Sequence, residues 1–348
     1  MTPRAFITGL SGATLTAEEC SFLREARPWG LILFKRNVET PAQVKALTAA
    51  FRDAVTAHAP VLIDQEGGRV QRLSPPHWGN YPAAAVYGRL YDRDRDDGRR
   101  AARLGARLIA AELLPLGIDV NCLPVADLLV AGANAVIGDR AYGDTPAKVA
   151  DLAGAAATGL LEGGVLPVVK HLPGHGRAGL DSHESLPVVD AAREILQTTD
   201  FAAFGPLAHL PLGMTAHVVF TAFDSRRPAT TSATIVHRVI RESIGFQGLL
   251  MSDDVSMGAL LGSIGERTVA CFAAGCDVVL HCNGSLDEME AVAAHAPALA
   301  GEAGRRAEAA LRLRRVEGEF DVERARTEFA ALLETERAGA PGRHHGCG

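Results

Sequence analysis

The segment KHLPGHGRAGLDSH, from Lys170 to His183, concentrates side chains that could do chemistry. It begins at the end of an apolar run and holds three histidines, a lysine and an aspartate among glycines and a proline. A packed core has little use for such residues, and a loop that is merely solvated rarely gathers histidine. A functional site is therefore favoured over a structural turn.

Two familiar motifs fit this segment poorly. Its glycines match the GxGxxG spacing of a dinucleotide-binding turn, with Glu194 farther on, but Pro187 would interrupt the helix that the motif requires. Asp181, Ser182 and His183 hold the residue types of a hydrolase triad, yet neighbours in sequence rarely converge as triad members do. Both interpretations are disfavoured.

Two further interpretations concern the start of the segment. Lys170 could form a Schiff base if apolar walls lowered its pKa, but the surrounding histidines and arginines favour binding of an anion or a hydroxyl group. His171 and His175 could ligate zinc from one face of a helix, but Pro173 and Gly174 between them break that helix. We therefore predict neither a Schiff base nor a metal site.

The end of the segment is better suited to proton transfer. Imidazole titrates near neutral pH, so His183 can donate a proton and later accept one, and the carboxylate of Asp181 can orient its ring. A glycine-rich loop would let this pair move over a bound substrate. Such a pair needs a nucleophile across the pocket.

The best candidate for the nucleophile lies in the sequence SDDVSM, where an apolar run ends. If this run is a strand, Asp253 shares a face with Leu249 and Met251, whereas Asp254 lies on the other face with Leu250. Periodicity does not tell which face points into a site. Either carboxylate could instead cap a helix or form a structural salt bridge.

Eight short apolar runs, each bounded by turn residues, alternate with segments of helical periodicity. The strands are expected at 5–8, 30–34, 61–64, 118–122, 166–171, 212–216, 248–253 and 277–281, and helices at 41–57, 98–116, 147–163, 232–244 and 258–274. Near-continuous apolar strands indicate a parallel sheet that is covered by helices. We predict an α/β fold, a single-domain (β/α)8 TIM barrel with extra C-terminal helices, and keep a doubly wound open sheet as the rival.

In such a barrel the carboxyl ends of the strands meet at one mouth, where active sites lie. Polar residues follow the predicted strands at that end, in the sequences DQEGGRVQRL, NCLPVAD, KH, TAH and SDD. One polar strand end is commonplace, but five that face one rim are hard to obtain by chance. The sequence therefore predicts that the candidate residues converge.

Composition excludes several classes of protein. The chain has 348 residues with Lys+Arg 35, Asp+Glu 41 and a net charge of -6, without a basic patch, so nucleic acid is not an expected partner. The six cysteines are scattered and behave as buried thiols, which favours a reducing, cytoplasmic location. No apolar run approaches the ~18 residues of a membrane span, and the start resembles a first strand, not a signal peptide.

Residues 1–338 are predicted to form one catalytic domain, whose helices at about 300–337 pack outside the barrel. Residues 339–348 have no apolar period and are expected to be disordered. His344 and His345 in this tail lack a second cluster of metal ligands, so no metal site is predicted there.

Four motifs in order resemble glycoside hydrolase family 3, specifically its single-domain bacterial β-N-acetylglucosaminidases of peptidoglycan recycling. They are DQEGGRVQRL, GDRAYG, KHLPGHGRAGLDSH and SDDVSMGAL. The segments GLILFKRNV, ELLPLGIDVNCLPVAD and AAGCDVVLHC also resemble that family, so the match covers about residues 5–300. The sequence departs from the family at Leu172, where phenylalanine is usual, and at Arg177 and Ala178, where polar or acidic residues are common. These departures bear on the loop and on subsite preference rather than on the chemistry.

The resemblance implies a TIM barrel and a retaining mechanism. By position, Asp253 would be the nucleophile, His183 the general acid and base, and Asp181 the partner of His183. The same resemblance implies substrate contacts from Asp64, Arg72, Arg140, Lys170 and His171. Carboxylates and cationic donors of this kind suit sugar hydroxyls and an oxocarbenium-like transition state.

The function expected is exo-cleavage of terminal N-acetylglucosamine from muropeptide fragments that carry 1,6-anhydro-N-acetylmuramic acid, by a monomer or weak dimer without metal or organic cofactor. A phosphorylase is the alternative enzyme, because histidine admits phosphate where a carboxylate would repel it. A sugar-binding barrel without activity is the third reading, although it would not need Asp253.

Overall fold

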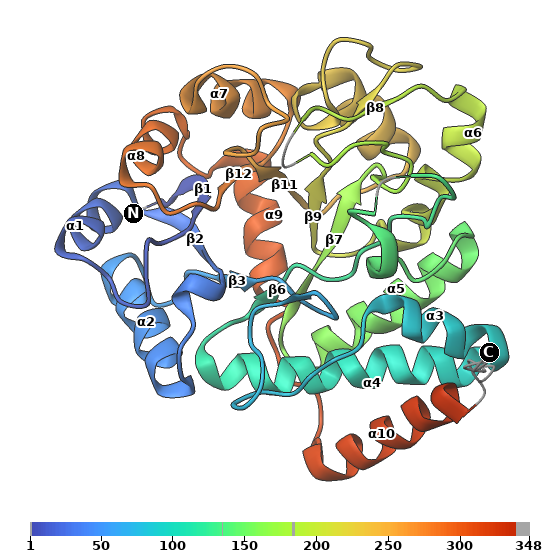
Figure 1. Cartoon of the computed structure of the whole chain (residues 1–348). Coiled ribbons are helices and arrows are strands. Elements are labelled where there is room, and N and C mark those ends of the chain that lie inside the picture. The colour runs from blue at the N-terminus through green and yellow to red at the C-terminus, as the bar shows by residue number, and fades with distance from the viewer. Residues whose placement is uncertain (1, 134, 183–184, 339–348) are drawn as a thin grey trace, which may run out of the picture.

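The computed structural model describes residues 2–133, 135–182 and 185–338. There, parallel strands form a closed barrel in which each strand pairs with the next and the last pairs with the first (Figure 1). The barrel strands are β1 (Arg4–Thr8), β2 (Pro28–Leu33), β3 (Val61–Ile63), β6 (Val120–Asn121), β7 (Leu166–Leu172), β9 (Leu212–Thr215), β11 (Leu249–Asp254) and β12 (Val278–His281). The predicted (β/α)8 barrel is confirmed, and the pairing of β12 with β1 excludes the open sheet.

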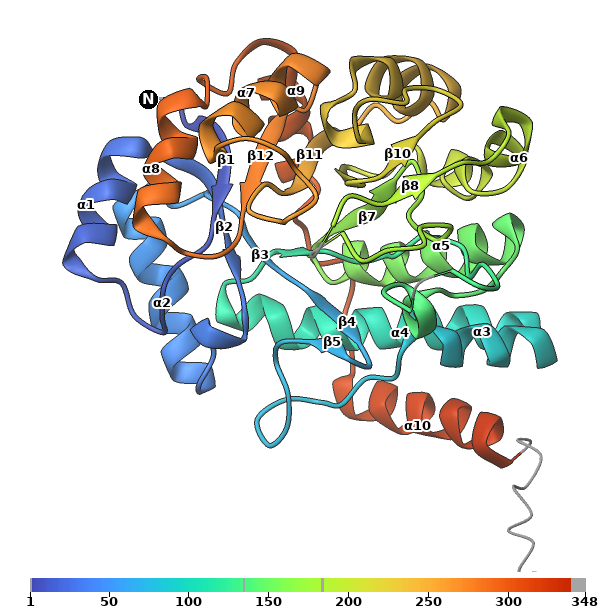
Figure 2. The same ribbon diagram turned by 45° about the horizontal axis from the view of Figure 1, so that its top comes forward.

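Helices surround this barrel in both views (Figure 1 and Figure 2). They are α1 (Ala17–Ala26), α2 (Pro41–Ala54), α3 (Ala84–Arg93), α4 (Arg95–Leu113), α5 (Pro146–Glu162), α6 (Arg193–Thr198), α7 (Ile264–Ala274), α8 (Leu286–His295), α9 (Gly301–Leu311), α10 (Val322–Ala338) and the π-helical segment η7 (Ile235–Ser243). In the part of the chain that is described, none of them has the length and apolar character needed to cross a membrane.

One predicted helix begins later than expected. The periodicity suggested a helix over 258–274, but α7 begins at Ile264. Ser263 forms a capping box with Glu266, and Gly262 adopts a positive φ of 89° just before it. The capping box fixes the helix start because Ser263 satisfies a backbone N–H that would otherwise lack a partner.

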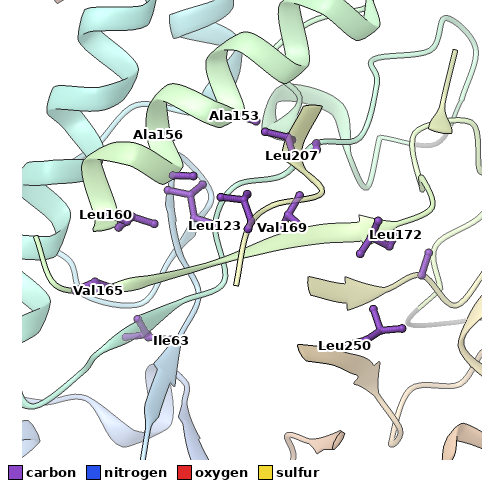
Figure 3. Close-up of a cluster of buried hydrophobic side chains, with 14 of the residues drawn as sticks. Ile63, Leu123, Ala153, Ala156, Leu160, Val165, Val169, Leu172, Leu207 and Leu250 are labelled. Carbon is purple, nitrogen blue, oxygen red and sulfur yellow. The ribbon is translucent and has the colours of Figure 1, made fainter. Parts of the chain in front are cut away.

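Alternation along the strands divides the apolar residues into two clusters. Leu249 and Met251 of β11 belong to the cluster inside the barrel, whereas Leu250 belongs to the cluster between the strands and the helices. In the same outer cluster, Val169 of β7 lies close to Ala153 and Ala156 of α5 (Figure 3). Residues that continue the inner series beyond each strand therefore point into the mouth.

The two C-terminal helices occupy different places. α10 packs against α4 and α3, outside the ring (Figure 1 and Figure 2). In contrast, α9 contributes Ala307 and Ala310 to the cluster inside the barrel and lies near the middle of the ring of strands in Figure 1. Arg306, in the middle of α9, binds Asp277, which precedes β12. This helix therefore covers the amino-terminal end of the barrel and leaves the opposite end open.

Candidate active site

A cavity of about 340 Å³ lies at the carboxyl ends of the barrel strands. Seven of the eight residues predicted from the sequence line it: Asp64, Arg72, Arg140, Lys170, His171, Asp181 and Asp253. They come from the ends of β3, β7 and β11 and from the loops that follow β3, β6 and β7. The eighth, His183, lies outside the described residues.

Buried ion pairs form one wall of the cavity. The ammonium group of Lys170, whose side chain is only 3% exposed, lies 2.9 Å from Asp64 Oδ1 and 2.7 Å from Glu66 Oε1. Arg72 donates to Asp64 Oδ2 at 3.0 Å. Arg140 binds both oxygens of Glu66, at 2.8 and 2.9 Å. Two carboxylates therefore hold three cationic side chains in fixed positions.

The pairing decides the charge state of these groups. Burial alone would raise the pKa of Asp64, but Lys170 and Arg72 hold it well below its ordinary value. Burial opposes ionisation of Glu66 as well, and Arg140 and Lys170 lower its pKa to about 2. Although burial acts to lower the pKa of Lys170, the two carboxylates raise it above its ordinary value. The wall stays ionised at neutral pH, so Lys170 cannot act there as a neutral amine.

Sequence reasoning missed Glu66 as a site residue. Its signal was present, because DQEGGR carries a second carboxylate two residues after Asp64. Glu66 lies in β4 (Gln65–Gly67), which pairs with β5 (Val70–Gln71) beside the mouth. What the sequence could not show is that its partner Arg140 would arrive from a different strand-helix loop.

Asp127 is a second residue that sequence reasoning did not select, although it ends the noted sequence NCLPVAD. Its side chain is fully buried, and Oδ2 lies 2.6 Å from Nδ1 of His171. Oδ1 accepts the backbone N–H of His175 at 2.6 Å. The pKa of Asp127 is lowered against the effect of burial, mainly by His171. A carboxylate in this place fixes the Nδ1–H tautomer of His171 and directs Nε2 away from Asp127.

The two neighbouring aspartates of β11 lie in different environments. Asp253 continues the inner series of Leu249 and Met251 and lines the cavity. Its Oδ1 accepts the N–H of Asp254 at 2.8 Å, and within the described ranges Oδ2 has no hydrogen-bond partner. Burial would raise the pKa of Asp253, but nearby histidines, this N–H and Lys170 lower it below its ordinary value. Asp253 is therefore a buried carboxylate with one oxygen available to a bound molecule.

The carboxylate of Asp254 forms hydrogen bonds that stabilise the turn after β11 and the start of the loop after β12. Its Oδ1 accepts the N–H groups of Ser256 and Cys282, at 2.9 and 3.1 Å, and Oδ2 accepts the hydroxyl of Ser256 at 2.7 Å. These bonds shape the turn after β11. The sequence left open which aspartate faces the mouth, and the bond pattern favours Asp253.

The loop after β7 is held at several described points. Nε2 of His175 lies 3.1 Å from Ser182 Oγ, and the Ser182 carbonyl accepts the N–H of Ala259 at 3.2 Å. Burial lowers the pKa of His175 to about 4, so its ring is uncharged at neutral pH. Arg177, one of the departures noted above, pairs with Asp200 at 2.9 Å. Ser182 and Arg177 therefore anchor the segment that carries Asp181, whose side chain lines the cavity.

Apolar side chains complete the lining of the cavity. They are Phe34, Met214, Met257 and Leu280, and the guanidinium group of Arg72 lies over the ring of Phe34. In the described ranges, no group of three or more His, Cys, Asp or Glu side chains is arranged to hold a metal ion. A cavity that presents fixed cations and carboxylates together with apolar side chains suits a polyhydroxylated ring.

Comparisons with known proteins agree with this geometry. Residues 10–316 match the model of the glycosyl hydrolase family 3 N terminal domain. The chain is similar to beta-hexosaminidases from Alkalilimnicola ehrlichii (40% identity over 293 residues, 83% of each chain) and Thioalkalivibrio sulfidiphilus (40% over 281 residues, 79% of each). It also resembles the crystal structure of NagZ from Neisseria gonorrhoeae in complex with N-trifluoroacetyl-D-glucosamine, with a TM-score of 0.83, 32% identity, and 97% and 98% of the two chains covered.

The depressed pKa of Glu66 predicts how stability depends on pH. Its value is about 2 in the folded protein against an ordinary 4.5, so its stabilising contribution is complete above pH 4.5 and is lost as the pH falls towards 2. One such group changes the free energy of unfolding by at most about 1.4 kcal/mol per pH unit. We expect the free energy of unfolding to fall less steeply with decreasing pH in Glu66→Gln than in the wild type. Urea unfolding between pH 5.5 and 3.5 measures this.

Glu308→Gln is the matched control, because among the described residues the Glu308 side chain pairs with Arg312 alone, and both side chains are exposed. Surface pairs contribute little, so this variant should keep the wild-type slope. If the free energy of unfolding depends on pH equally in the wild type and in Glu66→Gln, the lowered pKa of Glu66 is contradicted.

Proposed function

From the premise that this chain belongs to glycosyl hydrolase family 3 and is a β-N-acetylhexosaminidase, we propose that it is a retaining exo-β-N-acetylglucosaminidase of peptidoglycan recycling. Its substrate is the disaccharide N-acetylglucosamine linked to 1,6-anhydro-N-acetylmuramic acid, with or without a peptide. Residues 1–338 act as one catalytic domain, in the cytoplasm, as a monomer or weak dimer.

One observation carries the proposed mechanism, namely the environment of Asp253. The other two strand-end carboxylates of the wall, Asp64 and Glu66, are each bound to two cationic groups. Asp253 instead has one oxygen held by a backbone N–H and the other without a partner in the described part of the chain. An ionised carboxylate that is oriented but not neutralised is what a covalent glycosidase mechanism requires.

The reaction proceeds in two displacements. Asp253 attacks the anomeric carbon of the sugar and forms an ester, while His183 gives a proton to the departing oxygen. His183, now neutral, then takes a proton from a water molecule that attacks the same carbon and releases Asp253 as a carboxylate. Two inversions retain the β configuration. Asp181 orients the ring of His183, as a carboxylate does for a catalytic imidazole.

The wall residues bind the sugar. Arg72 and Arg140 donate from fixed positions, and Lys170 and Asp64 together present a donor and an acceptor. Nε2 of His171 faces away from Asp127 and so can meet a hydroxyl group. Support for an N-acylated glucosamine as the ligand comes from the similar NagZ structure, which holds N-trifluoroacetyl-D-glucosamine.

The substrate proposal predicts a defined product. We expect the protein to release N-acetylglucosamine from the disaccharide with 1,6-anhydro-N-acetylmuramic acid, with the β anomer formed first because the mechanism is retaining. Proton nuclear magnetic resonance of the fresh reaction distinguishes the two anomers. The α anomer as first product would contradict the mechanism, and a rate no greater than on an unrelated β-glucoside would contradict the substrate.

A covalent label tests the nucleophile. A fluorinated aryl β-N-acetylglucosaminide that forms the ester faster than it is hydrolysed should add one sugar to the peptide that contains Asp253. Peptide mass spectrometry locates the label. Asp254 is the built-in control, because its carboxylate is used within the loop. A label on Asp254, or none at all, would reject Asp253 as the nucleophile.

The role of His183 predicts a dependence on the leaving group. We expect His183→Ala to reduce cleavage of poor leaving groups by about 10²-fold to 10⁴-fold, the usual value of general acid catalysis, and to spare activated aryl leaving groups in the first step. Rates for a series of aryl β-N-acetylglucosaminides measure this. Deglycosylation should also slow, because the same group acts as the base. Equal losses across the series would remove His183 from the acid role.

A further inference from the structure

A histidine at the end of β9 lies behind the site and belongs to none of the roles above. His217 is fully buried, and both of its ring nitrogens have partners. Nε2 lies 2.9 Å from the carbonyl oxygen of Asp254, and Nδ1 lies 2.7 Å from Thr230 Oγ1. A carbonyl oxygen can only accept, so Nε2 carries a hydrogen and donates it to Asp254.

Thr230 ties the other side of the ring to the barrel. Its hydroxyl lies 2.8 Å from Thr215 Oγ1 and 3.0 Å from the carbonyl of Ala216, both near the end of β9. Thr230 itself lies in the short 3₁₀ segment Ala229–Thr231 and is fully buried. The ring of His217 is therefore tied through Nδ1 to Thr230 and the end of β9, while Nε2 reaches across to Asp254 at the end of β11.

Asp254 links the ring of His217 to the carboxylate of Asp253. Its side chain is held by Ser256 and Cys282, and its N–H donates to Oδ1 of Asp253. Its carbonyl oxygen accepts from His217 and also from the N–H of Met257, at 3.1 Å. The direction of the Asp254 N–H sets the plane of the Asp253 carboxylate. Among the bonds to Asp254 in the described part of the chain, the one from His217 is made by a side chain from outside β11 and its following turn, in the segment after β9.

We propose that His217 is a positioning residue for the reaction, which acts through the backbone of Asp254 to orient the Asp253 carboxylate toward the cavity. This inference rests on the proposed function, because it takes Asp253 as the attacking group. His217 is not among the residues that line the cavity, and in the described part of the chain its hydrogen bonds go to Thr230 and Asp254 and not to Asp253. His217 affects the rate at which the glycosyl ester forms, because that step depends on the angle at which Asp253 approaches the sugar. It does not affect sugar binding, which the ion-paired wall around Lys170 provides.

Two variants of similar size separate the bond to Asp254 from the rest of the side chain. His217→Gln can place an amide N–H where Nε2 stood, because both atoms are equally far along the side chain. His217→Asn reaches only the position of Nδ1, beside Thr230. A third variant, Thr230→Val, removes the hydroxyl that fixes the ring and leaves His217 itself unchanged, so the proposal does not depend on the folding of the His217 variants.

The measurement is the rate of labelling of Asp253 by the fluorinated N-acetylglucosaminide, together with the dissociation constant of N-acetylglucosamine. We expect His217→Asn to slow labelling by about 10-fold to 100-fold, as small misplacements of reacting groups do. His217→Gln should stay within about threefold of wild type, and Thr230→Val should lie between them. The dissociation constant should change by less than about twofold in all three, since the binding wall is untouched.

His281→Gln is the matched control. His281 is also a fully buried histidine at a strand end, but it binds Glu288 on the outer side and does not contact Asp254. We expect it to lower the melting temperature without slowing labelling. Equal labelling rates for Asn and Gln at position 217, losses confined to sugar binding, or an equal loss in His281→Gln would each overturn the proposal. A wild-type label on a residue other than Asp253 would reject the nucleophile itself, which is a failure of the proposed function.

Discussion

The ammonium group of Lys170 is the constraint around which the mouth of the barrel is built. A buried cation without partners would shift its pKa and lose its charge, so its two carboxylate partners are a condition of its being there. Asp64 and Glu66 meet that condition, and each brings an arginine with it. Since removal of any member leaves a buried charge unpaired, the wall forms as a unit. It gives the cavity donors and acceptors whose positions do not depend on a ligand.

The other end of the barrel uses the same chemistry for a different purpose. Asp119, before β6, binds Arg52 and Arg314, and Asp277, before β12, binds Arg241 and Arg306. The two aspartates also accept backbone N–H groups from neighbouring strands. These pairs lock the helices and the segments around α9 onto the amino-terminal ends of the strands, far from the cavity. Ion pairs thus stabilise the fold at one end, and at the other they prepare a binding surface.

The sequence predicted the residues whose signal is local and missed those whose partners are distant. Strand ends placed Lys170 and the pair Asp253 and Asp254 at the mouth, but alternation alone left open which aspartate faces it, and the resemblance to the family selected Asp253. Asp127 and His217 were visible only as polar residues after strands. Their partners, His171 and the carbonyl of Asp254, lie on other strands, so closure of the barrel had to be known first. The position of α9 could not be predicted for the same reason, because an alanine-rich helix can pack either against the end of the barrel or outside the ring of helices.

The charges around Asp253 have a consequence for a two-step mechanism. Against the effect of burial, nearby histidines and Lys170 lower the pKa of Asp253 below its ordinary value, so the carboxylate is ionised beside a fixed cation. In the mechanism proposed above, Asp253 becomes an ester in the first step, so one negative charge leaves the cavity while the cations of the wall stay. A site that has lost a negative charge favours the neutral form of an imidazole within it. Esterification would therefore help to turn the acid of the first step into the base of the second, without a change in the wall itself.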